Sequence, residues 1–453
     1  MNRHFFVRCA VIYPFQSRYA KLALHVLVVF SILLLDAKAG EQEDWNAKFQ
    51  TTYIWQEKQP FKSAYSGANS LVSNDEKSYS FTATVALGFR PWTDGEIYFN
   101  PEVAQGVPFS KLTGLGGMTN GEMARTSGAN PTFYRARLFL RQTWGFGTEQ
   151  DVVESAANQL GGQVNKRRLV LTVGNLSIPD LFDNNVYNHD SRTQFINWSV
   201  MAQGAYDFAA DARGYTSGIA LEYFYDDWAV RGGRFEQPIE SNGQALDAHL
   251  FTHYGDQIEI EHAHLIGEQA GKIRLLTFRN IAVMGSYQDA LDKASKNGSV
   301  PAISLVRRQQ AKLGYGVNIE QAMTENIGFF GRASWADGKT ETYAFAEIDR
   351  SISGGLLING DYWRRADDTL GVALAQNRLS AKHREYLAAG GLGFFVGDGR
   401  INYRPERICE IFYNIALAKN THLGINFQHI ENPAYNRDRG PVSVGSVRLH
   451  TEF

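Results

Sequence analysis

The chain ends in a segment whose side chains alternate between an apolar and a polar face. Reading back from the carboxy-terminus, the two faces are Phe453, Thr451, Leu449 and Val447 against Glu452, His450, Arg448 and Ser446. Successive side chains of a β-strand point to opposite sides, so this segment is a strand that meets two different environments. If the rest of the chain repeats the pattern, the whole fold must offer an apolar surface on one side of its strands and water on the other.

The alternation recurs along the chain. Residues 79–90, for example, place Tyr79, Phe81, Val85 and Phe89 on one face and serine, threonine, glycine and arginine on the other. Further examples are residues 312–320, 409–417 and 423–429, and similar segments begin near positions 45, 96, 133, 168, 217, 228, 257, 272, 325, 341, 355 and 369. Each is about 9–12 residues long, which suits a tilted strand that crosses a bilayer, and together they predict about 16 strands, between about 14 and 18.

A water-soluble sandwich would also alternate, but three features favour a membrane barrel. Many apolar faces end in Tyr, Trp or Phe, as the aromatic girdles of a membrane protein require. Short and long connections follow one another, and so many broad apolar faces would overfill one soluble core. The sequence therefore predicts an all-β fold, a transmembrane antiparallel β-barrel with long extracellular loops and short periplasmic turns. The barrel must be closed because lipid offers no hydrogen-bond partners to an open edge.

The amino-terminal residues have the three parts of a secretory signal peptide. Arg3, Arg8, Arg18 and Lys21 precede an apolar run from Leu22 to Leu35, and Ala37-Lys38-Ala39 is a cleavage pattern of small residues. We therefore predict a signal peptide over residues 1–39 and a single barrel domain over residues 40–453. No later run of 18 apolar residues exists and the mean hydropathy is −0.30, which argues against a helical membrane protein.

The polar faces of two adjacent predicted strands carry complementary charges. Residues 133–141 direct Arg135, Arg137 and Arg141 to one face, with Tyr134, Ala136, Leu138 and Leu140 on the other. Each arginine would cost about 2–4 kcal/mol if it faced the middle of the bilayer, so these side chains are expected to line the lumen. The preceding strand supplies a polar face of Glu96, Tyr98, Asn100 and Glu102. Guanidinium, carboxylate and aromatic groups together suit a sugar, whose hydroxyls form hydrogen bonds while its C–H face packs on a ring.

One long connection is rich enough in amides, charges and aromatic residues to narrow such a pore. Residues 176–213 include Trp198, Asp211 and Arg213, which we predict to be pore residues alongside those of the two strands. An ordinary surface loop of this composition is the alternative.

Other functions find little support in the sequence. The formal net charge of −2 offers nothing to a nucleic acid. His262 and His264 share one face of a strand, but no further ligands complete a metal site, so neither a metal nor a cofactor is expected. A barrel enzyme would need a nucleophile with a histidine in reach; His189-Asp190-Ser191 has suitable residue types, but side chains so close in sequence rarely converge. Catalytic residues are therefore not predicted.

Long segments across residues 45–453 resemble the carbohydrate-selective porins of the OprB type. They include PFKSAYSGANSL at 60–71, EIYFNPEVAQG at 96–106, RARLFLRQTWG at 135–145, FDNNVYNHDSRTQFINW at 182–198, YDFAADARGYTSG at 206–218, LAAGGLGFFVGDGRINYRPE at 387–406 and NPAYNRDRGPVSVGSVRLHTEF at 432–453. The last strand is also similar to those of bacterial outer-membrane barrels, in which the terminal aromatic residue, here Phe453, is read by the barrel-assembly machinery.

The resemblance implies an outer-membrane porin of a Gram-negative bacterium, embedded in outer-membrane lipids, that lets small sugars such as glucose diffuse passively through an arginine- and acid-lined pore. A homotrimer is one assembly that it allows. The resemblance does not locate the pore residues, so Arg135, Arg137, Arg141 and Glu102 rest on the strand argument alone. A general or anion-preferring porin is the alternative, since arginines would also attract acids.

Overall fold

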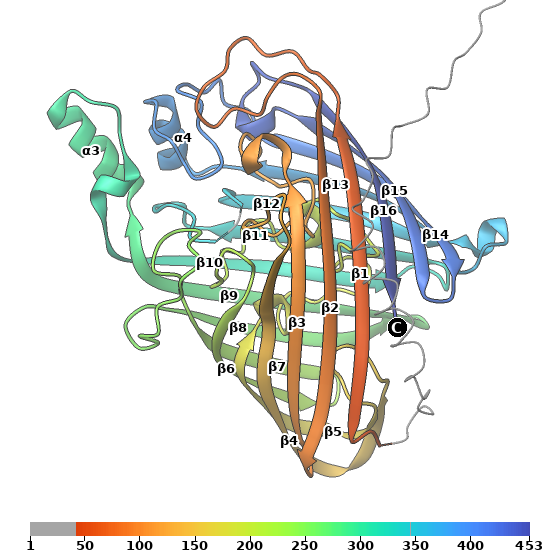
Figure 1. Ribbon diagram of the computed structural model, residues 1–453. Coiled ribbons are helices and arrows are strands. Elements are labelled where there is room, and N and C mark those ends of the chain that lie inside the picture. The colour runs from red at the N-terminus through yellow and green to blue at the C-terminus, as the bar shows by residue number, and fades with distance from the viewer. Residues whose placement is uncertain (1–41, 345) are drawn as a thin grey trace, which may run out of the picture.

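Sixteen antiparallel strands close into one barrel. The computed structural model describes residues 42–344 and 346–453, and each strand in it pairs with its neighbours in the chain, while the first strand pairs with the last (Figure 1). The strands are β1 (Trp45–Lys58), β2 (Glu76–Trp92), β3 (Gly95–Val107), β4 (Thr132–Val153), β5 (Gly162–Leu176), β6 (Thr216–Tyr225), β7 (Trp228–Glu236), β8 (Tyr254–Ile266), β9 (Gln269–Gly285), β10 (Arg307–Ala322), β11 (Ile327–Ala336), β12 (Arg350–Asn359), β13 (Thr369–Arg378), β14 (Glu406–Ala418), β15 (Thr421–Glu431) and β16 (Val442–Glu452). The predicted barrel and its count of about 16 strands are thus confirmed, whereas the predicted signal peptide lies outside the described residues.

Short helices lie in the connections. They are α2 (Trp198–Met201), α3 (Tyr287–Asn297) and α4 (Ala381–Ala388), with 3-10 turns η1 (Phe109–Leu112), η2 (Ile178–Asp180), η3 (Ile303–Val306), η4 (Gly360–Trp363) and η5 (Pro433–Tyr435). No helix among the described residues is long and apolar enough to cross a membrane.

The alternation in the sequence sets which side chains face outward. In β16, Val447 and Leu449 are about half exposed on the outer surface, whereas Arg448 and His450 are buried in the interior. His450 Nδ1 lies 2.8 Å from the hydroxyl of Thr52 on β1, across the seam that closes the barrel. The predicted polar face of the last strand therefore faces the lumen.

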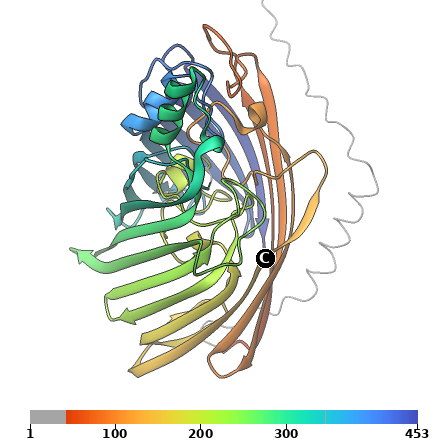
Figure 2. The same ribbon diagram turned by 90° about the vertical axis from the view of Figure 1, so that its left-hand side faces the viewer.

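The connections differ greatly at the two ends of the barrel. Turns of a few residues join most strands at one end, while connections of up to 39 residues, the longest being 177–215, occupy the other (Figures 1 and 2). In outer-membrane barrels the short turns are periplasmic and the long loops extracellular. We refer to these ends as the turn end and the loop end.

Three long connections pack together over part of the loop end. Helix α3 lies beside α4 (Figure 1), and the ring of Tyr287 stacks on the imidazole of His383 with centroids 4.3 Å apart. His383 Nδ1 also lies 3.0 Å from a carboxylate oxygen of Asp349 in a third connection. These contacts hold the outer loops in one cap.

At the turn end, the β4–β5 hairpin includes the longest of the described strands, the 22-residue β4, and its tip contacts side chains of β1 and β3. Its tip, residues 154–161, accepts hydrogen bonds from the amide of Asn46 at the carbonyls of Ala156 and Gln159. The backbone N–H of Leu160 donates to the hydroxyl of Tyr98 at 3.0 Å. Since Asn46 and Tyr98 face the lumen, the hairpin tip covers part of this opening from below.

Candidate functional site in the barrel lumen

The connection of residues 177–215, hereafter the inner loop, folds into the barrel. Its backbone N–H groups at Ile196 and Asn197 donate to the carboxylate of Glu410 on β14, at 2.7 and 3.0 Å. Further round the wall, Arg332 of β11 forms an ion pair with Asp183 at 3.0 Å, and the N–H of Asp183 donates to the carboxylate of Glu259 on β8 at 2.9 Å. The inner loop is thereby fixed to the wall at widely separated points, and the loop expected to narrow the pore does lie inside the barrel.

Aromatic side chains strengthen this attachment. Phe195 of the inner loop packs against the lumen-facing Phe412 and Phe330, with ring centroids 4.8 and 5.5 Å apart. Phe182 meets Phe235 of β7 edge-on at 6.3 Å. Such buried aromatic pairs add stability beyond the area that they cover. The part of the lumen bounded by β7–β14 is therefore packed rather than open.

A second long connection, residues 108–131, lies on the inner loop. The N–H of Trp198 donates to the carbonyl of Met118 at 2.9 Å, and the N–H of Gly121 donates to the carbonyl of Ile196 at 2.7 Å. Both connections therefore act together to reduce the width of the channel.

Where these loops meet β3 and β4, arginines, tyrosines and carboxylates gather. The constriction cluster, as we name it, consists of Glu102, Glu122, Tyr134, Arg137, Asp180, Arg192, Arg213 and Tyr215. Glu102 is its central acceptor: its carboxylate accepts hydrogen bonds from the hydroxyls of Tyr134 and, at 3.2 Å, Tyr215, and from Thr84 at 2.6 Å. Arg192 of the inner loop lies 3.8 Å from the same carboxylate.

The arginines of the cluster are held by carboxylates and by aromatic rings. Arg137 forms a two-pronged ion pair with Asp180, at 2.7 and 2.6 Å, and its guanidinium lies 5.4 Å from the centre of the Tyr215 ring. Arg213 lies 4.5 Å above the Tyr134 ring. Planar guanidinium groups favour both arrangements, which fix their direction in the lumen.

Solvent still reaches part of the cluster. The side chains of Arg192 and Asp180 are 26% and 31% exposed. A second set of charges on β6–β10 is different: Arg231 and Arg274 are bound by glutamates such as Glu261, and both arginines are almost fully buried. The charges on β6–β10 support the wall, whereas Arg192 and Asp180 of the constriction cluster remain available to a solute.

A cavity of about 290 Å³ lies between the inner loop and the hairpin tip 154–161. It is lined by Phe139, Arg141, Ala156, Ala157, Asn158, Gln159, Thr172, Leu176, Asp180, Leu181, Asn184 and His189. Within it, the hydroxyl of Thr172 and the amide oxygen of Asn158 are buried and have no hydrogen-bond partner among the described residues. Buried polar groups are nearly always paired, so these two atoms are suited to a bound solute or water.

The arginine ladder predicted on β4 is wrong at Arg135. Glu102 pairs with Tyr134, and Asn100 pairs with Arg137, so the register between β3 and β4 shifts by one residue and leaves Ala136 as a β-bulge. A bulge puts an extra residue into one strand and reverses the faces on either side of it. Arg135 is therefore exposed on the outer face, and Tyr134, expected to face lipid, points into the lumen.

The other predicted pore residues differ in where their side chains lie. Tyr98, Asn100 and Glu102 face the lumen as expected, and Arg141 donates to the carbonyl of Asn158 at 3.0 Å above the hairpin tip. Trp198 lies within the inner loop, where its ring stacks on Phe208 with centroids 6.4 Å apart. Asp211 and Arg213 belong to one turn, which places Arg213 at the constriction. The carboxylate of Asp211 accepts the N–H groups of Arg213 and Tyr215 and so shapes that turn.

Besides Tyr134, four members of the cluster were not predicted to be pore residues: Glu122, Asp180, Arg192 and Tyr215. All four lie in long connections, where no periodicity tells which side chain points inward. The only signal for these four residues in the sequence is that they are charged or aromatic and lie in connections next to strands with lumen-facing charges. Ser191, part of the considered catalytic triplet, donates its hydroxyl to Glu122 at 3.0 Å, and Asp190 accepts from Thr193. Both are thus engaged in holding the inner loop.

A closed barrel with an apolar outer surface and a loop folded into a polar lumen defines an outer-membrane porin. The chain belongs to the OprB family of carbohydrate-selective porins, whose family model matches residues 73–453. It is accordingly a carbohydrate-selective channel of the outer membrane rather than an enzyme.

Solved structures agree with this fold. The chain is similar to OprB of Pseudomonas putida, with 14% sequence identity, a TM-score of 0.70, and coverage of 90% of this chain and 94% of that one. It is also similar to the outer-membrane channel DcaP of Acinetobacter baumannii, with 10% identity, a TM-score of 0.50, and coverage of 92% and 100%. At such identities the likeness concerns the fold alone. No curated protein sequence is similar enough to count as a match.

Proposed function

We propose that small sugars such as glucose cross the outer membrane by passive diffusion through the constriction cluster. The observation that carries this proposal is the arrangement around Glu102, where two tyrosine rings and three arginines meet at the inner end of the long loops. A sugar ring can lie on the partly exposed Tyr215 while its hydroxyls exchange hydrogen bonds with guanidinium and carboxylate groups.

The balance of charge in the cluster favours a neutral solute. Arg137, Arg192 and Arg213 stand against three carboxylates, and both Arg137 and Arg192 are already paired with an acid. An anion would have to compete with these internal ion pairs. A general or anion-preferring porin is therefore the less favoured second function.

The cavity below the cluster supplies a second point of contact. Thr172 and Asn158 offer free hydrogen-bonding atoms there, while Phe139 offers an aromatic surface. Several weak contacts in series let a solute bind well enough to enter and weakly enough to leave, which channel conduction requires. Tyr98 and Arg141, whose guanidinium lies 5.1 Å from the Tyr98 ring, belong to this lower part of the proposed path.

Swelling of liposomes that contain the protein tests the proposal. Glucose is expected to enter faster than a disaccharide or an amino acid of similar polarity, and glucose added to a planar bilayer should reduce the ion current. In the R137Q/R192Q/R213Q variant the advantage of glucose should be lost because the hydrogen-bonding forks are removed.

R135Q is the matched control, because Arg135 belongs to the same strand but points outward. It should keep the wild-type preference. Preserved heat-dependent mobility in gels will show that both variants form barrels. A triple variant that retains the full preference for glucose would contradict the assignment, and strong anion selectivity without a glucose block would support the second function.

Two further expectations concern assembly. We propose that Phe453 serves as the signal for the barrel-assembly machinery, in keeping with its position at the seam, where its backbone exchanges hydrogen bonds with Phe49 of β1. Assembly into a homotrimer is the second, and cross-linking in native membranes would test it.

A further inference from the structure

Arginines line the loop end of three neighbouring strands on the outside of the barrel. Arg350 of β12 stands directly opposite Arg378 of β13, and Arg407 of β14 stands opposite Gln376, one outward position nearer the middle of the membrane. All three arginines are exposed. We call Arg350, Arg378 and Arg407 the outer arginine row.

An aromatic pair marks the level of this row in the membrane. Trp335 of β11 pairs with Arg350, and its ring stacks on Tyr315 of β10 with centroids 5.0 Å apart. Exposed tryptophan and tyrosine on a barrel wall gather at the boundary between headgroups and acyl chains. The outer arginine row therefore lies at the level of the lipid headgroups, on the side of the long loops.

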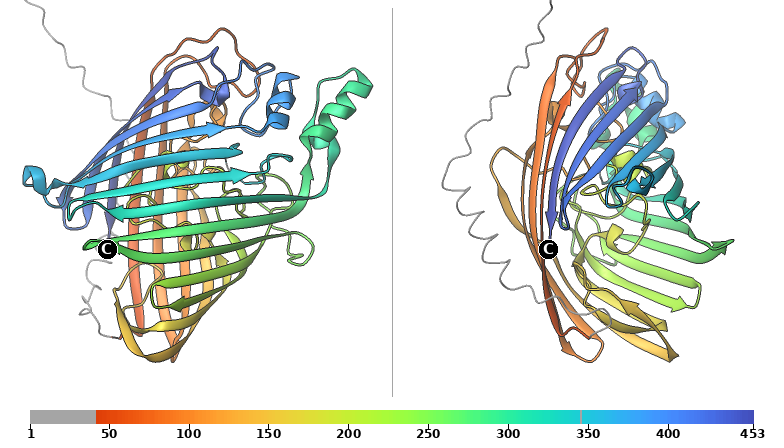
Figure 3. Two further views of the ribbon diagram at one scale, coloured as in Figure 1. Left: turned by 180° about the vertical axis from the view of Figure 1, so that it is seen from behind. Right: turned by 90° about the vertical axis from the view of Figure 1, so that its right-hand side faces the viewer.

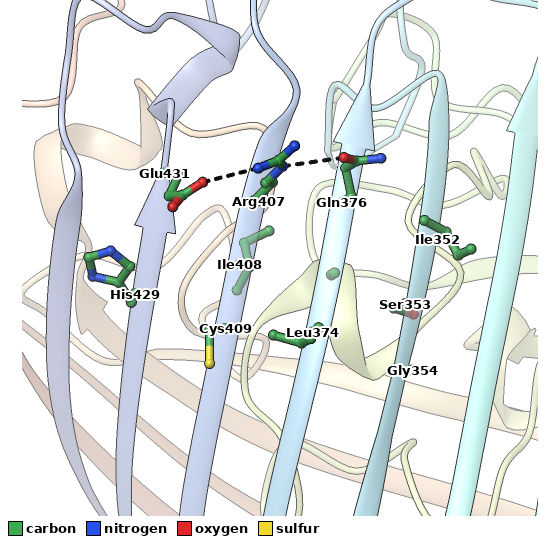
Figure 4. Close-up of a pocket in the computed structure, with 11 residues that line it drawn as sticks. Ile352, Ser353, Gly354, Leu374, Gln376, Arg407, Ile408, Cys409, His429 and Glu431 are labelled. Atoms are coloured by element: carbon green, nitrogen blue, oxygen red, sulfur yellow. Dashed lines mark hydrogen bonds and ion pairs between the residues drawn. The ribbon is translucent and has the colours of Figure 1, made fainter.

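A groove begins below the row. It has a volume of about 590 Å³ and is lined by residues of β12–β15 (Figure 4), the blue strands that lie side by side in Figure 3. Ile352 and Leu374, which are 57% and 63% exposed, line its apolar part together with Cys409. Gly354 adds no side chain, which leaves room between these neighbours. The groove thus has a polar end with arginine and an apolar end toward the centre of the bilayer.

Charge in the row is poorly balanced by the protein. Arg407 lies 3.6 Å from Glu431 and also contacts the side-chain amide of Gln376, as the dashed lines in Figure 4 show; in its better orientation that amide accepts hydrogen bonds from Arg378 at 2.8 and 3.1 Å. Arg350 and Arg378 form no ion pair with any described residue. Like charges directly opposite each other on a sheet are unfavourable, so an anion that bridges them would be stabilising.

We propose that this surface binds the phosphorylated glycolipid of the outer leaflet. A phosphate lies across the outer arginine row, and an acyl chain of the same molecule occupies the groove along Ile352, Leu374 and Cys409. Arginine is well suited to such a site because its planar fork binds phosphate with two hydrogen bonds. The site is separate from the lumen and concerns how the porin is held in its membrane, not what it transports.

Native mass spectrometry of the detergent-purified protein with lipid A tests the proposal. Wild-type protein is expected to retain at least one bound lipid A, and the R350Q/R378Q/R407Q variant should bind it at least fivefold more weakly. R135Q/R279Q removes two outward arginines from β4 and β9 and is the control, with little expected change. Equal losses in the two variants would overturn the proposal.

Cys409 gives a second, local measurement. Bound lipid A should slow alkylation of Cys409 by N-ethylmaleimide, read from the mass of the peptide that contains it, and the triple arginine variant should lose this protection. Phosphatidylglycerol is expected to protect less than lipid A. Equal protection by phosphatidylglycerol would overturn the assignment to the glycolipid. Protection of Cys409 in lipid-free protein, caused by self-association of the porin, would overturn it as well. Wild-type liposome swelling in the variant would show that the channel is intact.

Discussion

The carboxylate of Glu102 on β3 accepts a hydrogen bond from the hydroxyl of Tyr215 at 3.2 Å, although the two residues are 113 positions apart in the chain. Glu102 belongs to the barrel wall, and Tyr215 is the last residue of the inner loop. The bond therefore joins the wall to the loop at the point where arginines gather. It makes Glu102 the residue on which the geometry of the constriction depends most.

Glu102→Gln should change the ion selectivity of the channel. The substitution removes one negative charge from a cluster of three arginines and three carboxylates, and it leaves Arg192 with only Glu122. We expect a clear shift of the reversal potential toward anions in a salt gradient, and slower swelling in glucose. Hydrogen bonds to a charged group are worth about 1.5–3 kcal/mol, so the cluster should also loosen.

Glu222→Gln is the control for that experiment. Glu222 is also a lumen-facing glutamate bound to an arginine, but it pairs with Arg231 on the packed side of the wall. Its substitution should leave the reversal potential near the wild-type value. If E102Q behaves in the same way as E222Q, Glu102 does not govern the pore.

Two substitutions of Tyr215 distinguish the stacking of a sugar on its ring from the hydrogen bond of its hydroxyl. Tyr215→Phe keeps the ring beside Arg137 but loses the hydroxyl that binds Glu102, whereas Tyr215→Leu loses both. If a sugar packs on the ring, swelling in glucose should fall only modestly in Y215F and severalfold in Y215L, since ring stacking contributes about 0.5–1.5 kcal/mol. Equal rates in the two variants would show that the ring does not contact the sugar.

The cavity above the hairpin tip should contribute to the block of current by glucose. N158A/T172A removes two buried polar atoms of the cavity that have no partner in the part of the chain that the structure describes. Each hydrogen bond is worth about 0.5–1.5 kcal/mol, so the loss of both predicts a glucose block weakened at least about fivefold. Open-channel current should change little. Asn165→Ala, on the exposed part of the same hairpin, is the control and should leave the block intact.

The sequence predicted the barrel well because membrane strands follow a strict rule. Each strand has to place apolar residues toward lipid, so alternation in segments such as β16 is strong enough to reveal both faces. The lumen-facing positions of Tyr98, Asn100 and Glu102 followed from the same rule. A regular period cannot reveal a bulge, and the single extra residue at Ala136 was enough to misplace Arg135.

The constriction was less predictable, for a different reason. Asp180, Arg192 and Tyr215 reach the lumen because the inner loop is held by distant anchors such as Glu410, not because of their own local sequence. Composition indicated that a polar loop could enter the barrel. Which of its side chains would meet β3 and β4 depends on contacts across the whole lumen.

The stability of the turn end should depend on pH through a set of hydrogen bonds to Asp368, which we call the Asp368 clip. Asp368, in the turn before β13, accepts hydrogen bonds from Arg365, from the hydroxyl of Tyr413 at 2.6 Å and from the N–H of Ala416 at 3.0 Å. The hydrogen bond from Arg365 contributes most to holding the pKa of Asp368 at about 2. A lowered carboxyl pKa adds stability that is complete above about pH 4 and is lost as the pH falls through about 2.

Because solvent screens part of this set of hydrogen bonds to Asp368, the Asp368→Asn substitution should lower the free energy of unfolding by about 1 kcal/mol at pH 7. In urea unfolding followed by gel mobility, the difference from wild type should stay constant from pH 7 to about pH 4 and shrink below it. Asp361→Asn in the same turn is the control, and an equal loss there would show that the clip is not responsible.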